Sequence, residues 1–325
     1  MIPFPDPFRP WPRVAPFTKG RPAERHLAAF KAVLADPPPY PGGEGDGIVI
    51  VGGGKYWPGA AVACRIIRRL QCNLPVQAWY RSSCEAVRPA DVAGLGVDVI
   101  DMDAAMDALA DTRAPRGRGM PGGFEAKVYA VAHAPFRRLL YLDADAYPVT
   151  TPCRLFEELN AASFAFWADV PELANTARWH KLWPGGEAMN LPPVQAGQFL
   201  IDREAGWPLL AAAHWMNEHS DYYYQHGRDD QDCWRAAIAA TGTPYALMGQ
   251  SRRVGPALVC DRSGRTVVVH RVAGKLFPGT TPPRDDRLPF EREVFEEFAG
   301  LDAEMPAVPL SPPPMTAGAG CCPGR

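Results

Sequence analysis

Two carboxylates stand two residues apart at the end of an apolar, strand-like run. The segment Tyr141–Asp145 reads YLDAD, in which Ala144 separates Asp143 from Asp145. On an extended backbone, residues i and i+2 point to the same side, so both carboxylates can face one space. Carboxylate oxygens suit Mn²⁺ or Mg²⁺, and such ions often share their remaining coordination positions with substrate phosphates. The pattern indicates a divalent-metal site, where the small Ala144 leaves room for a ligand.

A second aspartate pair has the same spacing. Asp101 and Asp103 follow another apolar run, but they directly precede the helical pattern Ala104–Ala110. An aspartate in that position ordinarily caps the helix N-terminus. The residues after Asp145, in contrast, read YPVT and do not begin a helix. Spacing alone does not choose between the pairs, but capping accounts better for the first pair than for the second.

A histidine and a lysine follow a later strand pattern. His270 ends the run Thr266–Val269, and Lys275 comes five residues later in HRVAGK. The imidazole could supply a third metal ligand and the lysine a contact to phosphate. The alternative is a partly buried histidine beside a solvated lysine.

Carboxamides and carboxylates also stand at two loop edges. Gln195, Gly197 and Gln198 lie where a polar turn enters an apolar strand, and Asp230-Gln231-Asp232 opens a helix. Such groups can recognise sugar hydroxyls through paired hydrogen bonds. Helix capping and solvation are the alternative, and a capping role is expected for Asp229 or Asp230 in either case.

A glycine turn follows the first predicted strand. Gly52-Gly53-Gly54 leads into Lys55 and Tyr56, but the segment lacks the final glycine of GxGxxG and the Lys-Ser/Thr of a P-loop. It is either a tight strand-to-helix turn or a turn that approaches a nucleotide, since sheet crevices bind ligands at the carboxyl ends of strands.

These residues need a scaffold, and hydrophobic periodicity predicts one in which strands alternate with helices. The predicted strands are Gly47–Val51, Val76–Tyr80, Val97–Ile100, Leu139–Leu142, Phe164–Ala168, Gln198–Ile201 and Thr266–Val269. The predicted helices are Ala60–Leu70, Met102–Ala110, Glu125–Ala134, Pro208–Glu218, Asp230–Ala240 and Phe290–Phe298. We therefore expect an α/β fold: a single domain with a mainly parallel central sheet covered by helices on both faces.

Prolines mark the two ends of the chain. Of 36 prolines, eleven lie in residues 1–45 and ten in residues 278–325. Because proline cannot donate to a helix or a sheet, we expect residues 1–45 to form an arm with one short helix, Pro22–Leu34. The domain should span residues 46–300, and residues 301–325 should form a flexible tail.

Composition excludes several classes of protein. With 325 residues and 47% hydrophobic content, the chain can build a sizeable core, and its net charge of −2 provides no basic field for nucleic acid. The eight cysteines lack CxxC pairing, so we expect reduced thiols. The sequence shows neither a signal-peptide pattern nor an apolar run long enough to span a membrane, and we expect a cytoplasmic protein.

Taken together, the motifs resemble those of GT-A glycosyltransferases. The resemblance is strongest to the fungal α-mannosyltransferase family, glycosyltransferase family 71, and more distant to the glycogenin-like family 8. The similar stretches occur in the same order as in the family and span about 190 residues; they are Gly47–Trp79, Phe124–Pro152, Gln195–Asp202 and Asp229–Trp234.

The resemblance implies a role for each motif. Asp143 and Asp145 would hold a divalent metal on the donor diphosphate together with His270, and Lys275 would face the diphosphate. Asp230, Gln231 and Asp232 resemble the catalytic segment beside the donor sugar. The remaining donor-side candidates come from four segments of the chain: Gly52, Gly53, Lys55, Tyr56, Lys127, Ala144, Gln195, Gly197 and Gln198.

The resemblance further implies a single GT-A, Rossmann-like domain and a retaining hexosyltransferase that uses Mn²⁺ or Mg²⁺. Its donor would be a nucleotide sugar, either GDP-mannose or a UDP-sugar, and mannose is favoured. The acceptor would be a glycan, a glycolipid or a peptide. A metal-dependent nucleotidyltransferase and a catalytically silent sugar-binding protein are the two alternatives, since both could use the same fold and acidic pair.

Overall fold

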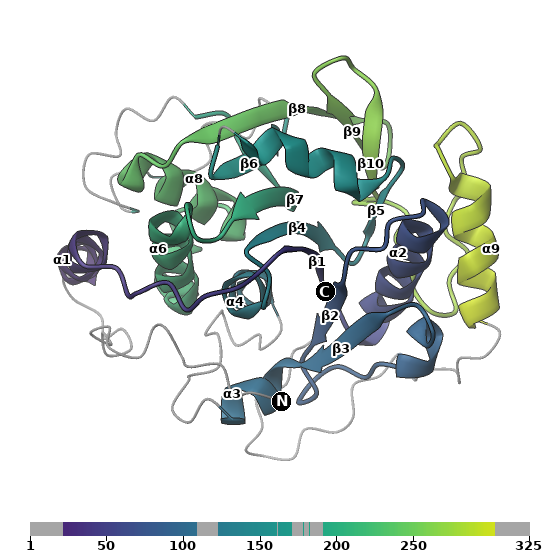
Figure 1. Ribbon diagram of the computed structural model, residues 1–325, viewed down its shortest axis with the longest axis horizontal. Coiled ribbons are helices and arrows are strands. Elements are labelled where there is room, and N and C mark those ends of the chain that lie inside the picture. The colour runs from purple at the N-terminus through teal and green to yellow at the C-terminus, as the bar shows by residue number, and fades with distance from the viewer. Residues whose placement is uncertain are drawn as a thin grey trace.

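The computed structural model describes residues 22–108, 123–160, 162–170, 178, 182 and 191–302. A ten-stranded sheet runs through this part of the chain, with helices packed on either side (Figure 1). Residues 1–21 of the predicted N-terminal arm and almost all of the predicted tail lie outside the described residues. Within them, no helix combines the length and the apolar character needed to cross a membrane.

The elements follow the predicted alternation. The strands are β1 (Asp46–Val51), β2 (Val76–Tyr80), β3 (Val97–Asp101), β4 (Arg138–Asp143), β5 (Ala146–Pro148), β6 (Phe164–Ala168), β7 (Val194–Asp202), β8 (Tyr245–Arg253), β9 (Ala257–Asp261) and β10 (Thr266–His270). The α-helices are α1 (Pro22–Ala35), α2 (Trp57–Arg69), α3 (Met102–Ala108), α4 (Glu125–His133), α6 (Trp207–Glu218), α7 (Ser220–Tyr223), α8 (Asp229–Thr241) and α9 (Glu291–Asp302). The 3₁₀ helices among the described residues are η1 (Gly54–Tyr56), η2 (Pro89–Val92) and η3 (Pro152–Asn160).

The sheet has the strand order β3-β2-β1-β4-β7-β6-β8-β9-β10-β5. The strands β3, β2, β1 and β4 are mutually parallel and confirm the predicted parallel core. Beyond β4 most neighbours are antiparallel, and only β6 and β8 pair in parallel. The connections from β8 to β9 and from β9 to β10 are short. They impose antiparallel pairing, because parallel neighbours need a long crossover.

Helices cover both faces of the sheet, as predicted. Val49 points into a core shared with α1, α4, α6 and α8, whereas Ile48 and Ile50 point into a core shared with α2, η3 and α9. This alternation places successive side chains on opposite faces and explains the nearly continuous apolar runs of the central strands. The short helix predicted after the proline-rich start is α1, whose Phe30 and Val33 are buried in the first core.

The described fold contains three strands that periodicity did not predict. β8 reads YALMGQSRR, and most of its side chains are exposed or half-buried, so it lacks an apolar signature. β5 has only three residues and ends in Pro148, and β9 is a short apolar run just after β8. β7 begins four residues earlier than predicted, because the polar side chain of Gln195 is buried inside the strand instead of lying in a turn.

Candidate metal and donor site

The site begins where β4 ends. Asp143 is the last residue of β4, and a two-residue turn through Ala144 and Asp145 leads into β5. β5 pairs antiparallel with β10, so that His270 lies opposite Ala146. The amide of Arg271 donates to the carbonyl of Asp145 at 2.7 Å and fixes the turn against the end of β10. The pairing brings residues that are more than 120 positions apart into contact.

Asp143, Asp145 and His270 form one cluster. Each contributes a ligand atom, and these atoms lie within 4.8 Å of one another. His270 Nε2 is 3.1 Å from Asp145 Oδ1 and 3.8 Å from Asp143 Oδ2, and the imidazole is buried. Two carboxylates and an imidazole suit a divalent cation such as Mn²⁺. The geometry fits the metal site predicted from the sequence.

Gly197 of β7 makes space for this cluster. A Cβ atom at Gly197 would collide with the imidazole ring of His270 and lie 3.1 Å from Asp143 Oδ2. The absence of a side chain therefore lets His270 and Asp143 pack against the backbone of the strand. This close approach gives a physical reason for glycine at a position predicted to contact the donor.

Two lysines neutralise the aspartates. Lys127 of α4 is buried, and its Nζ lies 3.2 Å from Asp143 Oδ1 and 3.1 Å from Asp230 Oδ2. Burial would lower the pKa of Lys127, but Asp143 and Asp230 outweigh it and raise that pKa. Lys275 pairs with Asp145 Oδ2. Burial would raise the pKa of Asp145, but His270 and Lys275 outweigh it and hold that pKa well below its usual range.

The glycine turn lies against the Asp143–Asp145 turn. A Cβ atom on Gly52 would come within 2.5 Å of Ala144 Cβ, so the two turns touch. Next along the chain, Tyr56 packs edge-to-face against Phe277 with ring centroids 5.2 Å apart, and Lys275 Nζ lies 5.3 Å from the Tyr56 centroid. Gly52, Ala144, Tyr56 and Lys275 thus share one edge of the sheet.

Gly53 and Lys55 complete the glycine turn. A Cβ atom on Gly53 would lie 2.8 Å from Glu85 Cβ, so this residue faces the segment after β2 rather than the aspartates. Lys55 Nζ lies 5.3 Å from the Phe277 ring centroid. The turn therefore connects the Asp143–Asp145–His270 cluster to the carboxyl end of β2.

The predicted sugar-side residues at the start of α8 have different surroundings. Asp230 is buried, and burial raises its pKa to about 8, although Lys127 opposes the rise. Gln231 Nε2 lies 3.5 Å from Asp169 Oδ2. Asp232 accepts hydrogen bonds from the Arg228 amide at 2.6 Å and from Arg235 Nη1 at 3.0 Å. Asp230 therefore connects to the metal cluster through Lys127, whereas the carboxylate of Asp232 stabilises the first turn of the helix.

The N-cap of α8 was expected at Asp229 or Asp230, but it is Arg228, and Asp229 is the first residue of the helix. Asp229 still stabilises the helix start with its carboxylate. Its Oδ1 accepts a hydrogen bond from the Gln231 amide at 3.1 Å. Burial raises the pKa of Asp229, whose backbone has a positive φ of 37°.

The two glutamines of β7 have different surroundings. Gln195 Nε2 donates to Ser251 Oγ of β8 at 3.4 Å. Gln198 lies opposite Leu142 in the strand register, is 0% exposed, and has no hydrogen-bond partner for its amide among the described residues. Since Gly197 faces His270, the pleat directs Gln198 to the other face of the sheet. A donor contact by Gln198 stays a prediction.

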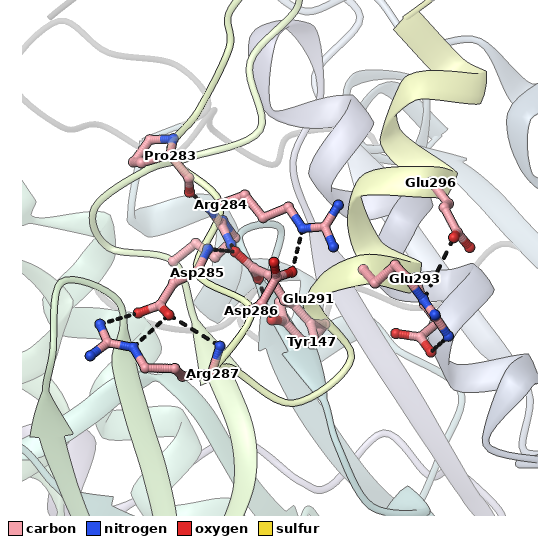
Figure 2. Close-up of polar contacts among 11 residues, drawn as sticks. Tyr147, Pro283, Arg284, Asp285, Asp286, Arg287, Glu291, Glu293 and Glu296 are labelled. Carbon is pink, nitrogen blue, oxygen red and sulfur yellow. Dashed lines mark hydrogen bonds and ion pairs between the residues drawn. The ribbon is translucent and has the colours of Figure 1, made fainter.

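A buried ion pair anchors the segment that follows His270. Arg271 Nη1 donates to both carboxylate oxygens of Glu291, at 2.9 and 2.8 Å, and both side chains are almost fully buried. Glu291 also accepts from Tyr147 Oη at 3.2 Å and from the Asp285 amide at 3.0 Å. Figure 2 shows Tyr147, Asp285 and Glu291 together at the start of α9. The pair thus ties the Lys275 segment and α9 to β5.

Sequence reasoning did not identify several of these neighbours. Tyr141 Oη donates to Asp143 Oδ1 at 2.6 Å, which the i, i+2 spacing on a strand could have indicated. Asp169 directly follows β6 and is buried beside Gln231 and Arg253, so its position at a strand end was also a usable signal. No local pattern pointed to the Arg271–Glu291 pair.

Comparisons with known proteins agree with this geometry. The family described as "Mannosyltransferase putative" matches residues 45–173. The Candida albicans α-1,2-mannosyltransferase MNN24 is 24% identical over 262 residues, covering 66% of this chain and 35% of MNN24. The chain therefore spans about a third of the length of that relative.

Among solved structures, the galactosyltransferase LgtC in complex with donor and acceptor sugar analogues superposes with a TM-score of 0.51 at 15% identity. That match covers 79% of this chain and 96% of LgtC. An active-site mutant of LgtC gives a TM-score of 0.50 at 16% identity, covering 81% of this chain and 98% of the mutant. The protein has the GT-A fold, and its sequence is similar to those of mannosyltransferases, as the resemblance predicted.

Proposed function

We propose that this protein is a metal-dependent, retaining glycosyltransferase that transfers a hexose from a nucleotide sugar to a glycan, glycolipid or peptide acceptor. The observation that carries the proposal is the convergence of Asp143, Asp145 and His270 at the carboxyl edge of a GT-A sheet. The names of the similar proteins support sugar transfer, and two of the three favour mannose as the sugar.

The chemistry needs positive charge beside the leaving group. When the glycosidic bond to the diphosphate breaks, the leaving nucleoside diphosphate gains negative charge. A divalent cation, Mn²⁺ or Mg²⁺, held by Asp143, Asp145 and His270 would stabilise that charge. Lys275 is within reach of the same phosphates, because its flexible side chain is partly exposed and contacts Asp145.

The buried residues keep this arrangement in place. Lys127 contacts Asp143, Asp230 and the Ala196 carbonyl, so it joins β4, β7 and α8 at one point. We assign Asp230 and Gln231 to the donor-sugar side of the site because they lie next to that junction. Asp232 stands one turn into the helix, where its contacts with Arg228 and Arg235 would hold Asp230 and Gln231 in position.

The donor would bind along the edge formed by the two touching turns. Gly52 packs against Ala144, and Tyr56 and Lys275 lie beside them. This edge is where nucleotides bind in open α/β sheets. GDP-mannose is the first donor to test, and UDP-hexoses are the second.

The test is a donor screen with the purified protein. GDP-mannose and a panel of UDP-hexoses are incubated with Mn²⁺ or Mg²⁺, with and without EDTA, and the phosphorylated products are separated and identified. Release of a nucleoside diphosphate from one donor, abolished by EDTA, is the expected result. Release of pyrophosphate from a sugar phosphate and a nucleoside triphosphate would support a nucleotidyltransferase instead. Donor binding without turnover, in the presence of a glycan acceptor panel, would support a silent sugar-binding protein.

A further inference from the structure

Two cysteine sulfurs meet on the α2 side of the sheet, outside the metal and donor site. Cys72 Sγ and Cys153 Sγ lie 3.4 Å apart, although the residues are 81 positions apart in the sequence. The sequence led us to expect scattered reduced thiols. The fold instead places these two in contact, which is the condition for a disulfide after a small rotation of either side chain.

Packed structure holds both cysteines in place. Cys72 follows the end of α2, where Arg68 Nη1 donates to its carbonyl at 2.6 Å and to the Leu74 carbonyl at 2.9 Å. Cys153 is in η3, whose Leu155 and Phe156 are buried in the core shared with α2. The proximity of the sulfurs therefore follows from the packing of α2 and η3 rather than from freely moving loops.

The two thiols differ in access. Cys153 is exposed, so a disulfide oxidant in solution can reach it, whereas Cys72 is buried behind it. Burial, followed by the neighbouring Cys153, raises the pKa of Cys72 to about 11, while the Leu74 amide opposes the rise. This arrangement allows oxidation in two steps, because the exposed sulfur can first react with the oxidant and the buried sulfur can then attack the exposed one.

We propose that Cys72 and Cys153 form a native disulfide when the protein meets a small-molecule disulfide such as oxidised glutathione. The Cys153 thiolate attacks one sulfur of the oxidant and expels one thiolate. The Cys72 thiol then gives its proton to solvent, attacks Cys153 Sγ, and expels the second thiolate. In the balanced exchange, two protein thiols become one disulfide and the oxidant is reduced to two thiols.

The disulfide would connect the segments on either side of the donor edge. α2 follows directly after the glycine turn, and η3 follows β5, which itself follows the Asp143–Asp145 turn. The link would close a loop of about 80 residues that contains β2, β3, α4 and β4. We expect it to restrict the unfolded chain and to raise the melting temperature without changing the contacts of the metal cluster.

To test the proposal, the folded protein is incubated in a buffer of oxidised and reduced glutathione, and its free thiols are then alkylated. The protein is digested with trypsin without reduction. The expected product links the peptide of residues 70–81, which contains Cys72, to that of residues 139–154, which contains Cys153. Its formation should raise the melting temperature by about 5–10 °C relative to the reduced protein. Cys72→Ser and Cys153→Ser should each lose both the linked peptide and the shift.

Cys84→Ser is the matched control, because Cys84 is also partly accessible but is not part of the pair. This variant should keep the linked peptide and the shift. The proposal is overturned if both peptides remain alkylated at redox equilibrium, if Cys153 stops at a mixed disulfide with glutathione, or if the linked peptide forms equally well in urea-unfolded protein.

Discussion

The two Asp-X-Asp segments make the most informative comparison in this molecule. Both follow parallel strands of the same sheet and end at the same edge. Asp101 Oδ1 accepts hydrogen bonds from the amides of Asp103 and Ser82, at 3.0 and 3.4 Å, and Asp103 pairs with Arg81 at 2.5 Å. Asp143 and Asp145 instead face His270 and two lysines from remote parts of the chain.

The difference lies in what each pair is joined to. In the first pair Asp101 caps α3, as predicted, and both aspartates also contact the loop after β2, so local groups satisfy their oxygens. The second pair has no helix to cap, and the β5–β10 pairing brings an imidazole to it. Identical spacing therefore has two outcomes, and long-range strand pairing decides between them.

The largest expected effect is the loss of catalysis in Asp145→Ala. In the proposed function Asp145 is a ligand of the cation, so its removal should lower the rate of donor cleavage about 1000-fold, which corresponds to about 4 kcal/mol of transition-state stabilisation. Initial rates of nucleoside diphosphate release measure it. Asp103→Ala is the matched control and should keep its rate within about threefold, and a similar loss in both variants would remove the distinction between the two pairs.

Next in size is the effect of breaking the buried ion pair that supports the His270 segment. Glu291→Ala leaves the Arg271 guanidinium buried without its carboxylate and should lower the free energy of unfolding by about 3–5 kcal/mol. Asp286→Ala removes an exposed partner of Arg284 and should change that energy by no more than about 1 kcal/mol. Urea denaturation compares the two, and equal effects would show that the buried pair does not anchor this segment.

Gly197→Ala should affect metal binding more than folding. The new methyl group would displace the His270 ring, so we expect the affinity for Mn²⁺ to fall about 10- to 100-fold. Gly300→Ala in α9 is the control, because a Cβ atom there meets nothing within 4 Å. Titration with Mn²⁺ followed by electron paramagnetic resonance measures both, and unchanged affinity in Gly197→Ala would count against His270 as a ligand.

Ionisation of Asp230 should make the melting temperature of the protein depend on pH. Burial raises the pKa of Asp230 in the folded protein from 3.8 to about 8. The contribution of the protonated carboxyl to the free energy of unfolding is therefore complete below pH 3.8 and is lost as the pH rises through about 8. Asp230→Asn stays neutral throughout. The melting temperature of the variant relative to wild type should therefore increase by at least about 3 °C between pH 5 and pH 9 in EDTA. A constant or falling difference would contradict the assignment.

The smallest effect is expected for the capping aspartate. Asp101→Ala removes the acceptor for the Asp103 amide in the first turn of α3 and should cost about 1 kcal/mol of stability. Donor cleavage at a temperature where the variant is folded should stay within about twofold of wild type. Thermal unfolding and initial rates measured on the same preparation test both parts.

Much of the fold could be predicted because the central strands and helices have strong periodicity. β8 was missed because its exposed polar side chains resemble a loop, and β5 because three residues carry no period. Their absence from the prediction explains why the sheet's antiparallel half was not anticipated: β8, β9 and β5 supply most of its pairings.

The site was only partly predictable for a related reason. Asp143 and Asp145 could be identified from their spacing at a strand end, and His270 became a ligand candidate mainly through the family resemblance. Contacts such as Lys127 with Asp230 join residues that lie about 100 positions apart, and a single sequence has no local signal for such pairs. The different surroundings of Asp230 and Asp232 likewise depend on packing, which places the carboxylate of Asp230 against Lys127 and that of Asp232 against Arg235.

Mn²⁺ binding, followed by electron paramagnetic resonance, tests most directly whether the second aspartate pair holds the cation. Wild type, Asp101→Ala and Asp145→Ala are titrated under identical conditions after treatment with EDTA and removal of the chelator. We expect one tightly bound Mn²⁺ in wild type and Asp101→Ala, and a loss of that binding in Asp145→Ala. Equal binding by all three proteins, or loss only in Asp101→Ala, would contradict it.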